Sequence, residues 1–315
     1  MTSPLPAEVF ARVAEREGAV WLDSSGLDAR WSVLTWSPRR TCTDPGQWQD
    51  FVRAEVQPAG ASEVPFAGGV LGYLGYGVGA TVESVPAEPP SDEPPLWLGR
   101  FDGALCFDHR AQRWHNHGTA SWRREAAQVL AAARPLPAPT PPRASQATTV
   151  DRRRYEADVE RILAWIAAGD CYQVNLSRPV WVRGATSALD AYRRLRAASP
   201  AAYGALLHPS DDLWILSNSP ELLVSSEGAS ALAEPIKGTR PRHPDPTRDA
   251  REARELLASD KERAELTMIV DLLRNDLGKV ARPGGVRAGA RALRSHGQVH
   301  HTHQPVHAAL RDDVD

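Results

Sequence analysis

Five prolines between residues 134 and 150 constrain how this chain can fold, in the segment RPLPAPTPPRASQATTV. Each proline fixes φ and removes a backbone donor, so this stretch should be extended and solvated rather than packed. Residues 135–150 are therefore predicted to be a linker. The linker would separate an N-terminal domain of residues 1–134 from a second domain of residues 151–315.

The hydrophobic pattern differs between the two predicted domains. The N-terminal one shows short strand-like runs and a glycine-rich strand segment, at Ala19–Asp23, Trp31–Trp36 and Gly68–Gly79. The second shows helical periodicity over Arg152–Ala168, Ala188–Ala198 and about Arg248–Asp276, the last with Gly278 as a left-handed cap. A hairpin is predicted from Leu213–Leu216 and Leu222–Ser225. Hairpins followed by helices favour an α+β layered fold over a doubly wound parallel sheet.

Composition excludes several classes of protein. The 315 residues carry 37 Lys+Arg against 39 Asp+Glu, which gives no general attraction to nucleic acid or to an anionic membrane. The sequence has no apolar run long enough for a membrane span and no secretory signal at its start. Its three cysteines form no CxxC pair, so a reducing, cytoplasmic location is expected.

Two carboxylates three residues apart, Glu262 and Glu265, fall on one face of the predicted long helix. The same stripe continues through Ala258, Ile269 and Leu272, so the carboxylates would face inward and need a cation or an ion pair. Mg²⁺ is often held by one or two carboxylates with waters and substrate oxygens. From these residues alone, a solvated face that pairs with neighbouring basic side chains is favoured, because structural charge pairs outnumber metal sites.

A lysine with possible nucleophilic chemistry is Lys237, in the run EPIKGT between a strand-like segment and a glycine. A desolvated lysine there would be neutral and nucleophilic, whereas a surface lysine before a turn is the commoner case. Glu221 lies in the turn SNSPE, and its carboxylate is either functional or part of a hairpin tip. Four histidines in Val299–His307 match no standard zinc spacing.

Three longer motifs, in order, resemble the chorismate-binding enzymes. They are GDCYQVNLS at residues 169–177, PIKGT at 235–239 and KERAELTMIVDLLRNDLG at 261–278. WLDS at 21–24 and the glycine-rich run at 68–79 are similar to further family segments. The resemblance implies an anthranilate synthase component I-like layered α/β sandwich with antiparallel sheets. The family's C-terminal motifs are absent, so the chain resembles a C-terminally truncated member.

The residue at position 237 distinguishes chemistries within that family. Anthranilate synthases resemble this chain at 235–239 but carry alanine in place of Lys237, whereas lysine is typical of aminodeoxychorismate synthase component I. The resemblance implies that this lysine attacks C2 of chorismate as the C4 hydroxyl leaves, after which ammonia adds at C4. Mg²⁺ is the implied cofactor, and a glutamine amidotransferase subunit is the implied source of ammonia.

The resemblance also implies a role for each matching residue. Lys237 would be the nucleophile, with Glu221 as a neighbouring acid/base group and His301 as the active-site histidine. Gly238 and Thr239 would line the substrate pocket.

The resemblance also implies roles for two carboxylates and for the residues of a second pocket. Glu265 would be a direct Mg²⁺ ligand, with Glu262 beside it in the outer shell. A possible tryptophan pocket would be formed by Asp23, Ser24, Pro200 and Tyr203.

Two alternatives to the aminodeoxychorismate synthase assignment remain. One is a non-catalytic remnant that binds a small molecule or a partner subunit, since the family's C-terminal substrate and metal residues are not found. The other is anthranilate synthase component I, which Lys237 disfavours. After the histidine, relatives continue with an aliphatic-Val-Ser run, whereas this chain has Thr302-His303-Gln304-Pro305.

Overall fold

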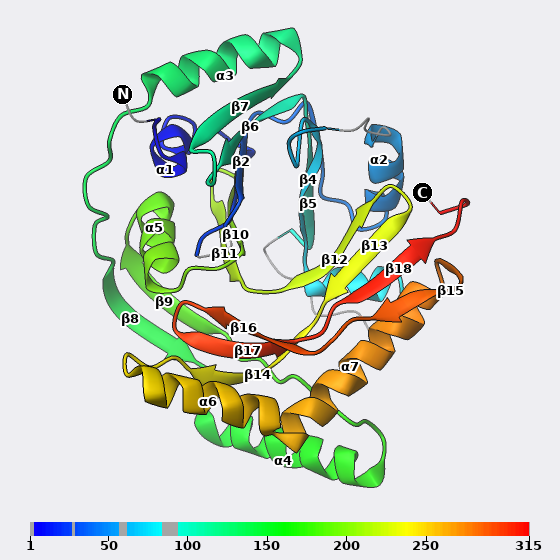
Figure 1. The fold of residues 1–315 in the computed structure, drawn as a ribbon. Coiled ribbons are helices and arrows are strands. Elements are labelled where there is room, and N and C mark those ends of the chain that lie inside the picture. The colour runs from blue at the N-terminus through cyan, green and yellow to red at the C-terminus, as the bar shows by residue number, and fades with distance from the viewer. Residues whose placement is uncertain (1–2, 27–28, 57–61, 84–93, 315) are drawn as a thin grey trace. The chain divides into compact units, whose positions relative to one another are not determined.

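The computed structural model describes residues 3–26, 29–56, 62–83 and 94–314. Runs of antiparallel strands are interspersed with helices along the chain, which confirms the α+β class (Figure 1). The helices are α1 Pro6–Phe10, α2 Trp48–Glu55, α3 Ala120–Ala132, α4 Arg152–Ala168, α5 Ala188–Ala198, α6 Pro246–Ala258 and α7 Asp260–Gly278, with a 3₁₀ turn η1 at Tyr76–Thr81.

Two sheets are built mainly from the N-terminal part of the chain. The larger has the strand order β11-β10-β1-β2-β6-β7, from β11 Leu213–Ser219, β10 Tyr203–Ser210, β1 Ala19–Asp23, β2 Trp31–Thr35, β6 Gly103–Asp108 and β7 Arg113–Gly118. The smaller pairs β3 Arg40–Cys42, β5 Leu96–Phe101 and β4 Gly69–Leu74. Strands β10 and β11 thus join the N-terminal sheet from a point much later in the sequence.

Three further sheets come from the rest of the chain. One has the order β12-β13-β18-β15, from β12 Leu222–Glu227, β13 Ser230–Glu234, β18 Val306–Leu310 and β15 Ala281–Ala288. The second has the order β14-β17-β16, from β14 Ile236–Pro241, β17 Val299–His303 and β16 Ala292–His296. The third pairs β8 Arg143–Thr149 with β9 Val180–Ala185.

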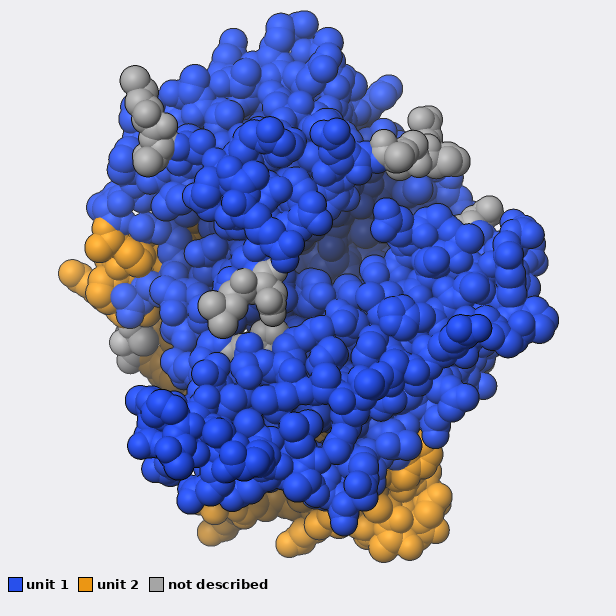
Figure 2. Space-filling model, viewed as in Figure 1, with its two compact units in different colours: residues 1–137, 192–315 blue, residues 138–191 orange. Residues whose placement is uncertain are grey.

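The chain divides into two compact units, and the division differs from the predicted domains (Figure 2). Unit 1 contains Met1–Pro137 together with Tyr192–Asp315, and unit 2 contains Ala138–Ala191. The predicted linker at 135–150 does not separate two halves, because its later part forms β8, which pairs with β9 inside unit 2. The strands β10 and β11 then carry the chain back into the N-terminal sheet of unit 1.

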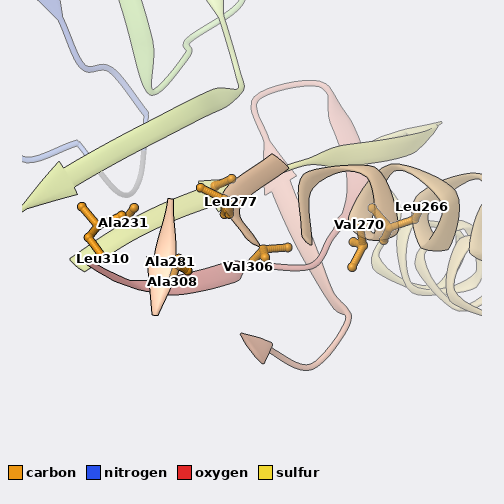
Figure 3. Close-up of a cluster of buried hydrophobic side chains, with 9 residues drawn as sticks. Ala231, Leu266, Val270, Leu277, Ala281, Val306, Ala308 and Leu310 are labelled. Carbon is orange, nitrogen blue, oxygen red and sulfur yellow. The ribbon is translucent and has the colours of Figure 1, made fainter. Parts of the chain in front are cut away.

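Unit 1 holds the buried core of the described chain. One cluster joins the inner face of α7 to the sheet that contains β18 and β15, and Figure 3 shows Leu266, Val270 and Leu277 on the helix with Val306 and Ala308 on the strand. Burying such side chains stabilises the fold by about 25 cal/mol for each Å² of apolar surface removed from water. Unit 2 differs, since none of its described residues is buried.

The expectation of one long helix at 248–276 was wrong, because this segment forms two helices, α6 and α7. Ser259 lies between them in extended conformation, and its side chain accepts a hydrogen bond from the backbone N–H of Glu262. An N-cap residue has non-helical backbone angles, so a serine that caps the second helix also ends the first one. Gly278 is the last residue of α7 and has no positive φ, so it is not a left-handed cap, and Lys279 caps the helix in right-handed helical conformation.

The predicted hairpin of residues 213–225 is also wrong. Strand β11 pairs with β10 and strand β12 pairs with β13, so the two lie in different sheets. The turn between them therefore crosses from one sheet to another and carries Glu221 with it. None of the described helices is long and apolar enough to cross a lipid bilayer.

Candidate active site

A bulge in strand β14 forms the centre of the candidate site. Lys237 pairs with Thr302 of β17 and Thr239 pairs with His301, so the register shifts between positions 237 and 239. Gly238 occupies the extra position with a φ of +69°, in the left-handed region that favours glycine. Bulges of this kind re-aim the side chains next to them and occur often beside active sites.

The backbone just before the bulge is held by side chains from other elements. Thr302 Oγ1 donates to the carbonyl oxygen of Lys237 at 2.7 Å. The backbone N–H of Ile236 donates to Oε1 of Glu221 at 2.8 Å. Glu221 therefore reaches β14 one residue before the half-buried Lys237.

His301 lies next to the same bulge. Its Nδ1 is 3.0 Å from the carbonyl oxygen of Gly238 and 3.2 Å from Oγ1 of Thr239. A carbonyl oxygen only accepts hydrogen bonds, so this contact requires the proton of His301 on Nδ1. The structure thus brings together three residues that the sequence predicts to line the site.

Helix α7 supplies the two predicted carboxylates at different depths. The side chain of Glu262 is 12% exposed and that of Glu265 is 34% exposed. Glu262 Oε1 lies 3.7 Å from Nη1 of Arg240 on β14, and Glu265 Oε1 lies 3.6 Å from Nζ of Lys261. The second contact is the neighbouring ion pair that the residue pattern alone favours.

The inward stripe of α7 runs one residue away from the predicted one. Leu266, Val270 and Leu277 are buried, whereas Leu272 is 47% exposed. Glu262 continues the buried stripe and Glu265 lies on its flank. The expectation that Leu272 faces inward was wrong, because the helix packs on β14 and β15 through the adjacent row of side chains.

The donor set on α7 fits Mg²⁺ in part. Among the described residues there is no group of three or more histidine, cysteine, aspartate or glutamate side chains that could hold a metal ion. Two carboxylates separated by three residues on one helix can hold Mg²⁺ when water and substrate oxygens complete the coordination. Glu265 and Glu262 are the residues that would hold it.

Sequence reasoning missed a partly buried cluster of polar and charged side chains on the other side of β17. His300 is buried, and its Nε2 lies 3.0 Å from Oδ1 of Asp249 on α6, while its Nδ1 lies 2.8 Å from Oγ of Ser295. Arg242 Nε donates to both carboxylate oxygens of Asp249, at 2.9 and 3.1 Å. These hydrogen bonds hold the pKa of Asp249 well below its usual value, with that from Arg242 contributing most. The alternation of β17 was the available signal, since His300 and His301 must face opposite sides.

The four residues of the expected tryptophan pocket line a single cavity. Asp23, Ser24, Pro200 and Tyr203 all contribute to a cavity of about 1010 Å³ in unit 1. The Asp23 carboxylate is already engaged, since it accepts from Ser32 Oγ at 2.7 Å and is ion-paired with Arg196.

This fold and these motifs define a class of enzyme that the comparisons identify. The chain belongs to the chorismate binding enzyme family, whose sequence profile matches residues 13–315. It is 39% identical over 247 residues to anthranilate synthase component 1 of Streptomyces coelicolor, covering 71% of this chain and 48% of that protein. It is 36% identical over 262 residues to aminodeoxychorismate synthase component 1 of Salmonella typhimurium, covering 80% of this chain and 56% of that protein.

A solved structure shares the fold. The crystal structure of anthranilate synthase component I from Streptococcus pneumoniae matches with a TM-score of 0.78 and 24% identity, over 92% of this chain and 71% of that one. This match confirms the expected layered architecture. The chain spans about half the length of the curated relatives that match it most strongly.

Proposed function

We propose that this chain is an aminodeoxychorismate synthase component I, which converts chorismate and ammonia to 4-amino-4-deoxychorismate and water. The observation that carries the proposal is Lys237 beside the Gly238 bulge, with its backbone held by Thr302 and its neighbour Ile236 held by Glu221. A lysine fixed at this point can act as a nucleophile toward a substrate bound along β14.

The proposed chemistry proceeds in two displacements. Lys237 Nζ forms a bond to C2 of chorismate, the double bond shifts, and the C4 hydroxyl leaves with its electron pair. Ammonia then bonds to C4, the double bond shifts back, and the bond between C2 and Nζ breaks. The lysine is regenerated, and one water is released for each ammonia that is incorporated. When bound, Mg²⁺ supplies a positive charge that stabilises the departing hydroxyl.

Other residues at the site position the substrate and move protons. Glu221 is the candidate acid/base group, since its carboxylate already reaches the backbone of β14. His301 is anchored through Nδ1 to Gly238, which fixes the direction of its ring. The backbone of Gly238 and the Thr239 hydroxyl form the wall of the proposed chorismate pocket.

A glutamine amidotransferase subunit is the proposed source of ammonia. The matched relatives are named as component 1 of their synthases, which supports a second component. Folate-type biosynthesis of para-aminobenzoate is the pathway in which such a product is used.

Anthranilate synthase component I is the second candidate. The observation in its favour is the 39% identity to the Streptomyces coelicolor anthranilate synthase, which exceeds the 36% to the Salmonella typhimurium aminodeoxychorismate synthase. Lys237 opposes it, because the resemblance assigns alanine to this position in anthranilate synthases.

Product identification separates these functions. The protein would be given chorismate, an ammonium salt and Mg²⁺, and the products separated by liquid chromatography. Aminodeoxychorismate that disappears with Lys237→Ala, but persists with Lys279→Ala, supports the proposal. Lys279 is a suitable control because its side chain is 69% exposed and pairs with Asp276. Anthranilate would favour the second candidate, and no conversion of chorismate would favour a non-catalytic protein.

A further inference from the structure

The two carboxylates proposed to bind Mg²⁺ are each paired with a cation of the chain itself. Glu262 Oε1 lies 3.7 Å from Nη1 of Arg240, and Glu265 Oε1 lies 3.6 Å from Nζ of Lys261. The first pair joins α7 to β14, whereas the second joins neighbouring turns of α7. A divalent cation that binds these carboxylates would compete with both side chains for the same oxygens.

The pair between Glu265 and Lys261 is weak. The lysine side chain is 78% exposed and the glutamate side chain 34% exposed. An exposed ion pair between residues four apart on a helix contributes little, because water screens both charges and the long lysine side chain loses freedom. Lys261 can therefore move away from a bound cation at small cost.

The pair between Glu262 and Arg240 lies deeper. The side chain of Glu262 is 12% exposed and that of Arg240 is 35% exposed. A carboxylate that has lost most of its contact with water needs a counter-charge within the protein. Oε2 of Glu262 faces the bulge, since it lies 2.8 Å from the position of a Cβ on Gly238, so Oε1 is the oxygen that meets Arg240.

Arg240 is held beside this carboxylate by the strand that carries it. Its backbone pairs with His300 of β17, and its Nη1 donates to the carbonyl oxygen of Thr239 at 3.0 Å. A guanidinium does not lose its proton in proteins, so the positive charge of Arg240 is permanent. Glu262 therefore has a fixed cationic neighbour, whereas Glu265 has a mobile one.

We propose that Arg240 is the built-in counter-ion of Glu262 and limits how tightly the α7 carboxylates bind a divalent cation. The proposal rests on the Mg²⁺ site of the proposed function and names the residue that opposes the cation there. A cation at Glu262 must either displace the guanidinium or lie beside it. Displacement breaks a partly buried ion pair, and coexistence brings like charges together, so both weaken binding.

Titration with Mn²⁺ tests the proposal without any catalytic step. Mn²⁺ prefers the same oxygen ligands as Mg²⁺, and unbound Mn²⁺ is measured directly by electron paramagnetic resonance. The whole chain would be titrated without chorismate or ammonia. Arg240→Gln should bind Mn²⁺ at least about threefold more tightly than the unchanged protein. Arg240→Lys keeps the charge and should bind Mn²⁺ like the unchanged protein.

Three further variants control for charge and location. Arg251→Gln removes the same charge from α6, where the side chain is 57% exposed and pairs with Glu255, and should leave the affinity unchanged. Lys261→Gln should tighten binding less than Arg240→Gln does. Glu262→Gln added to Arg240→Gln should abolish the gain.

Several results would overturn the inference. They are unchanged or weaker Mn²⁺ binding by Arg240→Gln, the same gain in Arg240→Lys or Arg251→Gln, a larger gain in Lys261→Gln, a gain that survives Glu262→Gln, or no Mn²⁺ binding by any variant. Product identification fails or succeeds separately. If Arg240→Gln gains affinity but the unchanged protein forms no aminodeoxychorismate, the proposed function is wrong and the role of Arg240 stands.

Discussion

Glu262 fills the space that a side chain at Gly238 would need. A Cβ on residue 238 would lie 2.8 Å from Oε2 of Glu262 and 2.8 Å from Cδ1 of Leu256, both closer than Cβ contacts allow. Because of this contact, the strand that carries Lys237 and the helix that carries the proposed Mg²⁺ ligands form one tightly packed unit. The glycine in the PIKGT motif is therefore favoured by its φ of +69°, and a larger residue there would also have to displace the ends of these two side chains.

Gly238→Ala should destabilise the protein more than Gly228→Ala. Gly228 has a φ of +54° but nothing within 4 Å of its ideal Cβ, so alanine there brings only backbone strain of about 1–2 kcal/mol. Alanine at 238 adds the collision with Glu262, and we expect at least about 1 kcal/mol more. Chemical denaturation of the two variants gives the comparison, and equal losses of stability would show that the collision relaxes without cost.

Glu265→Gln should raise the Mg²⁺ concentration needed for activity, whereas Glu255→Gln should not. Glu265 lies on α7 near the buried stripe, and Glu255 is a 58% exposed residue of α6 that pairs with Arg251. Both substitutions remove one negative charge, so a general charge effect would appear in both. The measurement is the rate of chorismate consumption as a function of Mg²⁺ concentration. The same Mg²⁺ dependence in both variants would mean that Glu265 is only a partner of Lys261.

Native alkylation should modify Cys171 well before Cys106. Burial raises the pKa of the Cys106 thiol to about 12, so almost no thiolate is present at pH 8, and the side chain is inaccessible. Cys171 is partly exposed. Peptide mass spectrometry after timed treatment with iodoacetamide gives the order of labelling, and Cys171→Ser should remove the fast phase. Labelling of Cys106 at the same rate in the folded protein would contradict the described packing of β6.

Amide hydrogens of α4 should exchange faster than those of α7. The two helices are of similar length, with 17 and 19 residues, but α4 has no buried residue whereas α7 buries three leucine and valine side chains. Helices without tertiary packing open at low free-energy cost. Hydrogen exchange followed by mass spectrometry compares peptides from the two helices. Equal protection of the two helices would indicate that α4 is stabilised by contacts despite the exposure of its side chains.

Some neighbours within the candidate site could be predicted from the sequence, but its long-range contacts could not. The PIKGT motif and Glu262 identify residues that lie against each other at the bulge, whereas Glu265 contacts Lys261 on its own helix. By contrast, the break at Ser259 depends on one side-chain hydrogen bond. The helical spacing of apolar residues continues across this position, so the sequence pattern does not reveal the break. The hairpin was mispredicted because local turn signals do not reveal which strand pairs with β11. The ion pair between the buried Asp23 and the half-buried Arg196 joins residues far apart in sequence, which no local pattern could indicate.

Covalent trapping at Lys237 tests the central claim most directly. The protein would be incubated with chorismate and Mg²⁺ without ammonia, digested and analysed by peptide mass spectrometry, with Lys237→Ala and Lys279→Ala in parallel. The account predicts that the peptide containing Lys237 gains the mass of chorismate less one water, that Lys279→Ala retains this adduct, and that added ammonium discharges it as aminodeoxychorismate. Aminodeoxychorismate formation by Lys237→Ala at the rate of the unchanged protein, with no adduct at residue 237, would contradict it.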